Sequence, residues 1–323
     1  MINTNTILIA VDAGKDTTKY VWKNENGMQR GRFRTKIKTM ENCGVDITGK
    51  TFKVEFEGRE YLVGDMVDES NLSFDLTKQS IEHKIAIYVA IWNILLIEKC
   101  DRVKLAIGAP VNIYKNKKLK DSYREYIFNN GIVDITVNDR NIKFVIDDVL
   151  VLPEAIGPVY ENINEYRNTR VNVIDIGGLN VNICRFNNLV PDLESMLVAN
   201  KGANILKSKI ADALTDEYGV IIYKSDVDQI LKDDVLYING KPQNDSKALI
   251  RKLMNEHLDD ICNFAKQNEL NIFDTNGKVA FCGAGSILLK DVIKEKYPHS
   301  VIINNAQDSN VIGFYKIISI KND

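Results

Sequence analysis

The chain has 323 residues, which is enough for roughly two domains with cores of their own. Its hydrophobic and charged fractions, 45% and 27%, are those of an ordinary soluble globular protein. The net charge of -2 means that the chain has no excess of basic residues, which argues against direct nucleic-acid binding.

Cysteine and histidine usage argues against a transition-metal or disulfide framework. Five cysteines are scattered without a C-x-x-C pair, and none of the three histidines stands in a cluster of cysteines or histidines. Met1 to Thr6 lacks the pattern of a signal peptide. The apolar stretch Ile85 to Ile97 is too short and too amphipathic to span a bilayer. We therefore expect reduced thiols, a cytoplasmic protein and no membrane partner.

The first motif with chemical content follows an apolar strand, Ile7 to Val11. This strand runs into an acidic residue and a glycine turn, and a strand of alternating character returns from Lys19. Backbone N–H groups at such a turn point at anionic oxygens, and the carboxylate can hold a cation nearby. A plain solvent-facing hairpin is the alternative. The turn reads Asp12-Ala13-Gly14-Lys15-Asp16-Thr17-Thr18, in which Lys15, Thr17 and Thr18 can add a cation and hydroxyl donors.

The next part of the first half predicts elements that serve the scaffold. Residues 31–80 indicate a small peripheral β insertion, and Ile81 to Glu98 has helical spacing typical of a structural helix. Val103 to Ile107 is a strand that ends in a Gly-Ala-Pro turn, and a basic helix follows to about Asn129. Further strands are expected over 136–151.

Glu154 stands where a strand passes into a predicted helix. The strand ends at Leu152, and Pro153 occupies a plausible first helical position. The carboxyl ends of strands are where open α/β sheets bind ligands. A glutamate at this place can also simply complement a helix dipole.

The second half opens with the same motif of an apolar strand, an acidic residue and a glycine turn. An apolar strand from Val171 ends at Asp175, and the glycines Gly177 and Gly178 turn the chain into a second strand. Gly202 then begins a helix, and the range 200–275 indicates a second peripheral subdomain, mostly helical. A strand over 278–281 closes on Cys282-Gly283-Ala284-Gly285-Ser286 before a helix expected over 287–295. Such a glycine-rich link can let a nucleotide lie against backbone, although the chain contains no P-loop motif.

These features occur twice at a spacing near half the chain length. Each half reads hairpin, inserted subdomain, strand, Gly-Ala turn and helix. Such a spacing predicts two similar domains rather than a solenoid. The sequence therefore predicts an α/β protein in which two similar domains face a ligand cleft. The expected domains are 1–160 with 311–323, and 161–310.

The ordered set of motifs resembles the actin, sugar-kinase and heat-shock-chaperone ATPase superfamily, with ribonuclease-H-like domains. Within it, the chain is most similar to plasmid-segregation actins of the ParM/StbA type. Asp12-x-Gly14 resembles the first phosphate motif, Asp175-Ile-Gly-Gly178 the second, and Gly283-Ala284-Gly285 the adenosine motif. Pro153-Glu154-Ala155 and Asn310-Val311-x-Gly313-Phe314 resemble the two connecting segments. Two departures are Leu179-Asn180, where relatives usually carry threonine, and Cys282, where a glycine is common.

The resemblance implies roles for these residues. ATP, or GTP, would bind with Mg²⁺, and Asp12 and Asp175 would hold the metal. Glu154 would orient or activate the attacking water. The nucleotide contacts implied by the two hairpins and the glycine turns are Gly14, Lys15, Asp16, Thr17, Thr18, Gly177, Gly178, Asn180, Gly202, Gly283, Ala284 and Gly285.

The resemblance also implies a bacterial, cytoplasmic ATPase that forms head-to-tail filaments and segregates or positions plasmid DNA. ATP would drive assembly and hydrolysis would drive disassembly. A DNA-binding adaptor at a centromere-like plasmid site would be the partner, because the near-neutral charge disfavours direct DNA contact. Two alternatives share the fold: a small-molecule kinase of the sugar-kinase type, and a nucleotide-dependent chaperone or scaffold that does not polymerise.

Overall fold

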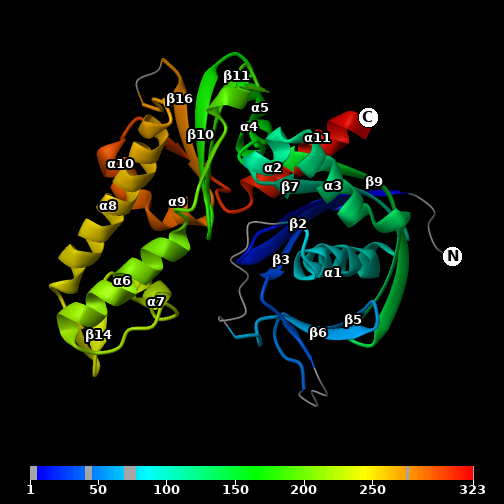
Figure 1. Cartoon of the computed structure of the whole chain (residues 1–323), viewed down its shortest axis with the longest axis horizontal. Coiled ribbons are helices and arrows are strands. Elements are labelled where there is room, and N and C mark those ends of the chain that lie inside the picture. The colour runs from blue at the N-terminus through cyan, green and yellow to red at the C-terminus, as the bar shows by residue number, and fades with distance from the viewer. Residues whose placement is uncertain (1–5, 41–45, 69–77, 274–275, 323) are drawn as a thin grey trace. The chain divides into compact units, whose positions relative to one another are not determined.

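A computed structural model describes residues 6–40, 46–68, 78–273 and 276–322 (Figure 1). The predicted absence of a signal peptide concerns residues that lie, up to position 5, outside these ranges. The chain divides into two compact units, the first formed by residues 1–163 with 308–323 and the second by 164–307. Each unit has its own sheet and core, and each is described by itself.

The first unit is built on a nine-stranded sheet with the order β3-β2-β1-β7-β9-β8-β5-β6-β4. Strand β1 lies inside this sheet, antiparallel to β2 and parallel to β7, which explains its almost continuous apolar sequence. The strands are β1 (Ile7–Ala13), β2 (Thr17–Asn24), β3 (Gly27–Arg34), β4 (Ile37–Thr39), β5 (Thr51–Phe56), β6 (Arg59–Gly64), β7 (Arg102–Ala109), β8 (Ile132–Val137) and β9 (Arg140–Pro153).

The predicted peripheral β insertion is continuous with this sheet. Strand β5 pairs with β8, and β6 joins β5 to β4, so the strands of the insertion extend the main sheet. The sequence does not predict this connection, because the pairing joins Val54 to Val137, residues far apart in the chain.

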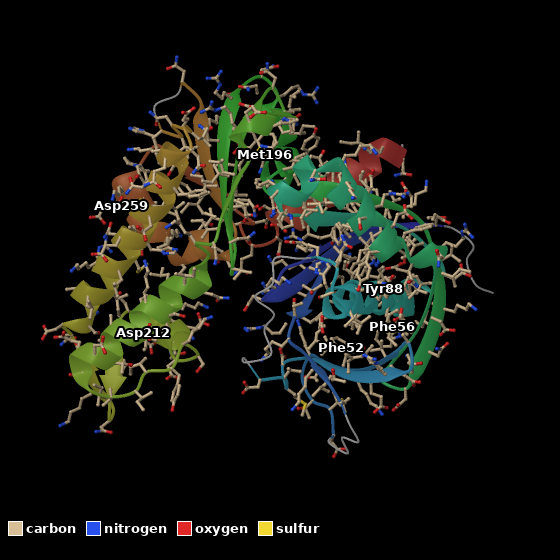
Figure 2. The ribbon with its side chains drawn as sticks, in the orientation of Figure 1. Phe52, Phe56, Tyr88, Met196, Asp212 and Asp259 are labelled. Atoms are coloured by element: carbon tan, nitrogen blue, oxygen red, sulfur yellow. The ribbon has the colours of Figure 1, made fainter. Side chains whose placement is uncertain are left out.

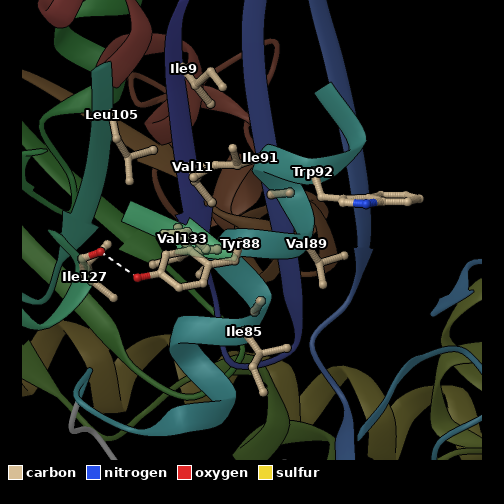
Figure 3. Close-up of a cluster of buried hydrophobic side chains, with 14 of the residues drawn as sticks. Ile9, Val11, Ile85, Tyr88, Val89, Ile91, Trp92, Leu105, Ile127 and Val133 are labelled. Carbon is tan, nitrogen blue, oxygen red and sulfur yellow. Dashed lines mark hydrogen bonds between the residues drawn. The ribbon is translucent and has the colours of Figure 1, made fainter. Parts of the chain in front are cut away.

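Helix α1 (Ile81–Glu98) is enclosed by the sheet. Residues 83–92 are all buried, and their core cluster includes side chains from β1, β5, β8 and β9. Figure 3 shows Ile9, Val11 and Val133 of this cluster around the helix. The hydroxyl of Tyr88 donates to the carbonyl of Ile127 at 2.8 Å (Figure 3). Its ring meets that of Phe56 edge-on, and Figure 2 labels both residues. The expectation of an amphipathic helix was wrong, because a helix that is apolar on every side is one that is buried on every side.

The remaining helices of the first unit follow the strands. The pair α2 and α3 occupies the place of the single basic helix that the sequence predicts, and Asn116 caps the second of them through its side chain. Helix α11 packs on β1, β2 and α4. The bounds are α2 (Val111–Lys115), α3 (Lys117–Phe128), α4 (Gly157–Glu161), α5 (Ile163–Tyr166, at the junction of the units) and α11 (Ser309–Asn322).

The second unit has a six-stranded sheet in which the path β12-β11-β10-β16-β17 carries β13 on β11. A separate two-stranded ribbon, β14 with β15, lies among the helices α6, α7 and α8 of the range 200–275. The strands are β10 (Arg170–Ile176), β11 (Val181–Asn187), β12 (Val190–Pro191), β13 (Leu197–Ala199), β14 (Leu236–Ile238), β15 (Lys241–Gln243), β16 (Lys278–Cys282) and β17 (Val301–Ile302). The helices are α6 (Ala203–Tyr218), α7 (Val227–Asp233), α8 (Ser246–Gln267), α9 (Ala284–Leu288) and α10 (Lys290–Lys296).

The two sheets share one core topology. In the first, β1 has antiparallel β2 on one side and parallel β7 on the other, and β9 continues parallel to β7. In the second, β10 has antiparallel β11 on one side and parallel β16 on the other, and β17 continues parallel to β16. The predicted α/β fold with two similar domains is confirmed at the level of strand order and direction.

Two further findings concern the parts of the chain that the structure describes. None of the helices there has the length and apolar character needed to cross a membrane. Cys100, Cys184, Cys262 and Cys282 are all buried, and none of these four forms a disulfide.

Candidate nucleotide site

The first predicted phosphate turn is a four-residue loop, residues 14–17, between the paired residues Ala13 and Thr18. Asp12 lies one residue before this pair and is 8% exposed. An added Cβ on Gly14 would lie 2.9 Å from the carbonyl oxygen of Thr17, so the turn closes too tightly for a side chain at this position. The loop therefore presents backbone at its tip, with a carboxylate at its base.

Alternation along β2 separates the predicted hydroxyl donors, because neighbouring residues of a strand point to opposite faces. Thr18 is fully buried and shares a hydrogen bond of 2.8 Å with the hydroxyl of Thr35, so the structure does not support it as a phosphate ligand. The hydroxyl of Thr17 donates to Asp16, whose carboxylate also lies 3.1 Å from Arg34. Asp16 thus stabilises the loop, and Thr17 lies on the same face of the sheet as Asp12.

Lys19 lies at the candidate site, although the sequence alone does not predict it. It pairs directly with Asp12 across the hairpin, and its Nζ lies 3.8 Å from the carboxylate. The alternation of β2 was visible in the sequence, but the register that places this cation beside Asp12 was not. Lys15, which was predicted, lies in the loop and is half-buried.

Glu154 lies directly after β9, which ends at Pro153. The prediction that Pro153 begins a helix was wrong: the next helix starts at Gly157, and Pro158 takes the early helical position. The parallel pairing of β7 with β9 continues to Pro153, and Glu154 extends it by donating its N–H to the carbonyl of Ala109. The residue is 9% exposed and belongs to the same sheet edge as Asp12.

A buried lysine contacts this glutamate. Lys78, 5% exposed, places its Nζ 3.3 Å from Oε1 of Glu154 and donates to the carbonyl of Ala13 at 3.1 Å. It precedes α1 in the sequence and carries no recognisable motif. Only the tertiary fold identifies it as part of the site.

Beneath these charges lies a buried neutral pair. Nε2 of His83 and the hydroxyl of Tyr123 are 2.8 Å apart, and Tyr123 also reaches the carbonyl of Gly108 at 3.4 Å. Burial holds the pKa of His83 well below its usual value, and the nearby positive charges of Lys78 and Lys15 add to this effect. Burial raises the pKa of Tyr123 well above its usual value. Both groups are therefore uncharged near neutral pH.

The second predicted turn repeats the geometry of the first. Residues 177–180 form a four-residue loop between Ile176 and Val181, and Asp175 precedes it with 6% exposure. An added Cβ on Gly177 would lie 3.0 Å from the carbonyl oxygen of Asn180, matching the 2.9 Å of the first loop. Asn180 thus stands where the first loop has Thr17. The buried Leu179 stands where the first loop has the polar residue Asp16.

The N-terminus of α6 is tied to this second loop. The N–H groups of Gly202, Ala203 and Asn204 donate to three successive carbonyls of residues 179, 177 and 178, at 2.8–3.0 Å. A Cβ on Gly202 would lie 2.4 Å from the carbonyl carbon of Leu179, so only glycine permits this approach. The loop and the helix start therefore form one rigid piece.

The glycines of the predicted adenosine motif have different surroundings. Gly283 has a φ of +83° and lies so close to Asp175 that a Cβ would be 2.6 Å from Oδ1. Gly285 is buried inside α9 against Ile176, so its smallness serves packing, whereas Ala284 is exposed. The helix also begins at Ala284, three residues before the predicted start, because the motif itself forms its first turn.

Each aspartate has a glycine beside it, in a neighbouring strand or directly after one. A Cβ on Gly108, in β7, would lie 3.7 Å from Oδ1 of Asp12, and a Cβ on Gly283, directly after β16, would lie 2.6 Å from Oδ1 of Asp175. In the described part of the chain, no three His, Cys, Asp or Glu side chains gather as a metal site. Mg²⁺ usually keeps several waters and takes one or two protein carboxylates with substrate phosphates, so the buried aspartate near a strand end in each unit is a ligand type that suits it.

The two predicted connecting segments meet inside the first unit. Asn310 accepts a hydrogen bond of 3.1 Å from the N–H of Ala155, which has a φ of +73°. A Cβ on Gly157 would lie 2.2 Å from Asn310, and one on Gly313 would lie 2.2 Å from Gly157. The glycines thus let α4 and α11 pack backbone to backbone, which fixes the strand end that carries Glu154.

Known proteins similar to this chain include actin-like proteins. A family model described as "Actin like proteins N terminal domain" matches residues 10–157. A search of curated protein sequences found no match. An archaeal actin homolog, Ta0583, is 18% identical with a TM-score of 0.82, and a ParM filament from Clostridium botulinum is 19% identical with a TM-score of 0.74. Each comparison covers 98% of this chain, and 100% and 99% of the respective relatives.

One solved structure is similar in sequence as well as in fold. The protein of the "Alp12 filament structure" is 30% identical, with a TM-score of 0.75, over 99% of this chain and all of the other. The duplicated sheet, the paired Asp–Gly loops and the connecting segments agree with this similarity. The chain belongs to the family of actin-like proteins.

Proposed function

We propose that this protein is a nucleotide-dependent, filament-forming ATPase that segregates or positions plasmid DNA. ATP binding favours assembly of head-to-tail filaments, and hydrolysis favours their disassembly. The observation that carries the proposal is the 30% identity, over nearly the whole of both chains, to a protein whose structure is that of a filament. Head-to-tail contacts give open filaments when their rotation does not close.

The paired loops support the nucleotide part of the proposal. Each offers glycine backbone to phosphate oxygens, and Asp12 and Asp175 are the carboxylates available to Mg²⁺. When bound, the metal supplies positive charge against the β- and γ-phosphates. Lys15 and Lys19 add cations at the first loop.

Glu154 is the group proposed to act on the attacking water. A general base must lie within hydrogen-bond reach of the proton it accepts, and Glu154 stands at the strand edge that carries Asp12 and the first loop. On the second loop, Gly178 and Asn180 contact phosphate. Gly202, Gly283 and Ala284 flank the nucleoside, with Ala284 exposed enough for contact.

The proposed partner beyond the filament is a DNA-binding adaptor on the plasmid. The net charge of -2 supports an indirect attachment, because a surface that binds DNA directly needs a basic face. ParM appears among the structural relatives, and another relative is described as "AlfA Filament bound to AMPPNP".

Sedimentation and light scattering with ATP, GTP, ADP and no nucleotide test the proposal. We expect assembly at micromolar protein with a triphosphate, and phosphate release that follows it. The variant Glu154→Gln is expected to bind nucleotide and assemble but to lose about 10²–10⁴-fold in hydrolysis. Failure to assemble, together with phosphate transfer to a metabolite, would replace the filament proposal by the kinase alternative.

A further inference from the structure

Lys78 stands where three elements of the first unit converge. It precedes α1, its Nζ donates to the carbonyl at the end of β1, and the same Nζ lies 3.3 Å from Oε1 of the glutamate that follows β9. Its side chain is 5% exposed, and that of Glu154 is 11% exposed. One ammonium group thus ties Glu154 to Ala13, the residue directly before the first phosphate loop.

A buried lysine needs a partner whose attraction offsets the free-energy cost of removing its charge from water. The titratable groups near Lys78 are the carboxylates of Glu154 and Asp12, the loop cation Lys15, and the uncharged pair His83 and Tyr123. Among the residues that the structure describes, the negative charges there are those two carboxylates, and Glu154 is the one that forms an ion pair with Lys78, at 3.3 Å. The lysine is therefore held in place by the same group that the proposed hydrolysis needs.

We propose that Lys78 is the positioning residue for Glu154. It holds Oε1 at a fixed place relative to the carbonyl of Ala13, so that the carboxylate is oriented toward the first loop. This inference rests on the proposed ATPase activity. A misplacement of about 1 Å in a catalytic group can cost on the order of 10²-fold in rate, so a single ion pair that sets this geometry has a large effect.

The test is a double-mutant cycle on the full chain with Lys78→Met and Glu154→Gln. Steady-state phosphate release is measured at saturating Mg-ATP, nucleotide affinity is measured separately, and pelleting with a nonhydrolysable ATP analogue monitors assembly. We expect Lys78→Met to lower kcat by roughly 10–100-fold. Nucleotide affinity and assembly should change by less than about threefold, a cost below 1 kcal/mol.

The decisive comparison is the effect of Lys78→Met in the Glu154→Gln background. A residue that acts only through Glu154 has nothing left to position there, so the double variant should hydrolyse ATP no more slowly than Glu154→Gln alone. This double variant also removes both buried charges together, so it is expected to stay folded where Lys78→Met alone is destabilised.

Lys84 offers a matched control. Lys84 lies on α1 and, like Lys78, is buried, at 6% exposure. Its Nζ, however, contacts Asn129 and the ring of Tyr126. Lys84→Met should alter stability without changing kcat.

The outcomes separate the two proposals. If wild type hydrolyses ATP and Glu154→Gln does not, but Lys78→Met retains full kcat, the positioning role is refuted. It is equally refuted if Lys78→Met slows the Glu154→Gln variant further, because the lysine then acts on the nucleotide itself. A wild-type protein without nucleotide-dependent hydrolysis refutes the proposed function instead.

Discussion

Replacing Gly202 by alanine probes how the second phosphate loop is held. Gly202 precedes α6 with a φ of -71°, so alanine fits the backbone conformation without strain. The conflict is one of space: a Cβ would lie 2.4 Å from the carbonyl carbon of Leu179 and 2.5 Å from the carbonyl oxygen of Gly178. Ordinary contact begins at 3.4 Å, so the loop and the helix must separate by about 1 Å.

The energetic cost follows from what that separation breaks. Three backbone hydrogen bonds of 2.8–3.0 Å join residues 202–204 to the loop carbonyls, and a separation of about 1 Å takes them beyond bonding distance. At roughly 0.5–1.5 kcal/mol for each bond, the second unit should lose about 2–4 kcal/mol of stability. The loop amides should also move away from the positions that bind phosphate.

The assay is denaturant unfolding with and without Mg-ATP, combined with direct nucleotide titration. A ligand that binds only the folded state stabilises it by RT ln(1 + [L]/Kd), so weaker ATP binding means a smaller gain. Gly202→Ala should therefore lose both intrinsic stability and most of the ATP-dependent gain. Gly240→Ala is the control: its φ is +75° in open space, so it should cost about 1–2 kcal/mol without touching nucleotide affinity. Wild-type stability and affinity in Gly202→Ala would refute this account of the loop.

Three further predictions address the metal, the core and acid stability. Asp175→Asn, or chelation of Mg²⁺ in wild type, should weaken ATP binding about tenfold or more in a titration, about 1.4 kcal/mol; unchanged affinity would exclude Asp175 as a metal ligand. Tyr88→Phe should lower the free energy of unfolding by about 1–3 kcal/mol, because the buried carbonyl of Ile127 loses its donor; an unchanged unfolding midpoint would contradict this. Burial, with a smaller effect of Lys209, lowers the pKa of His257 to about 4 from 6.5. Since the unfolded chain then takes up the proton first, stability should be full above pH 6.5 and fall by about 3 kcal/mol toward pH 4. A His257→Leu variant should flatten this slope in unfolding measurements, and an equally steep slope would contradict the assignment.

Much of the fold follows from local sequence signals. Apolar β-branched runs ended by Asp12 and Asp175, each with glycine two residues later, predict two hairpins wherever the rest of the chain lies. The Asn-Gly and Asp-x-Gly turns determine where the strands stop. The boundary at Pro153 was wrong because proline is compatible both with the end of a strand and with the start of a helix, and only the pairing with β7 decides between them.

The candidate site likewise combines features that local sequence predicts with features that only strand pairing and burial create. Local sequence is enough to predict which residues lie in the two loops, because turn geometry and the need for glycine are local properties. The burial of Thr18, the pairing of Lys19 with Asp12 and the packing role of Gly285 follow only from the folded chain. So does the contact of Lys78 with Glu154, which lies 76 residues further along the chain in sequence numbering. Contacts of this kind depend on strand register and on burial summed over distant segments, and no local pattern of residue types encodes them.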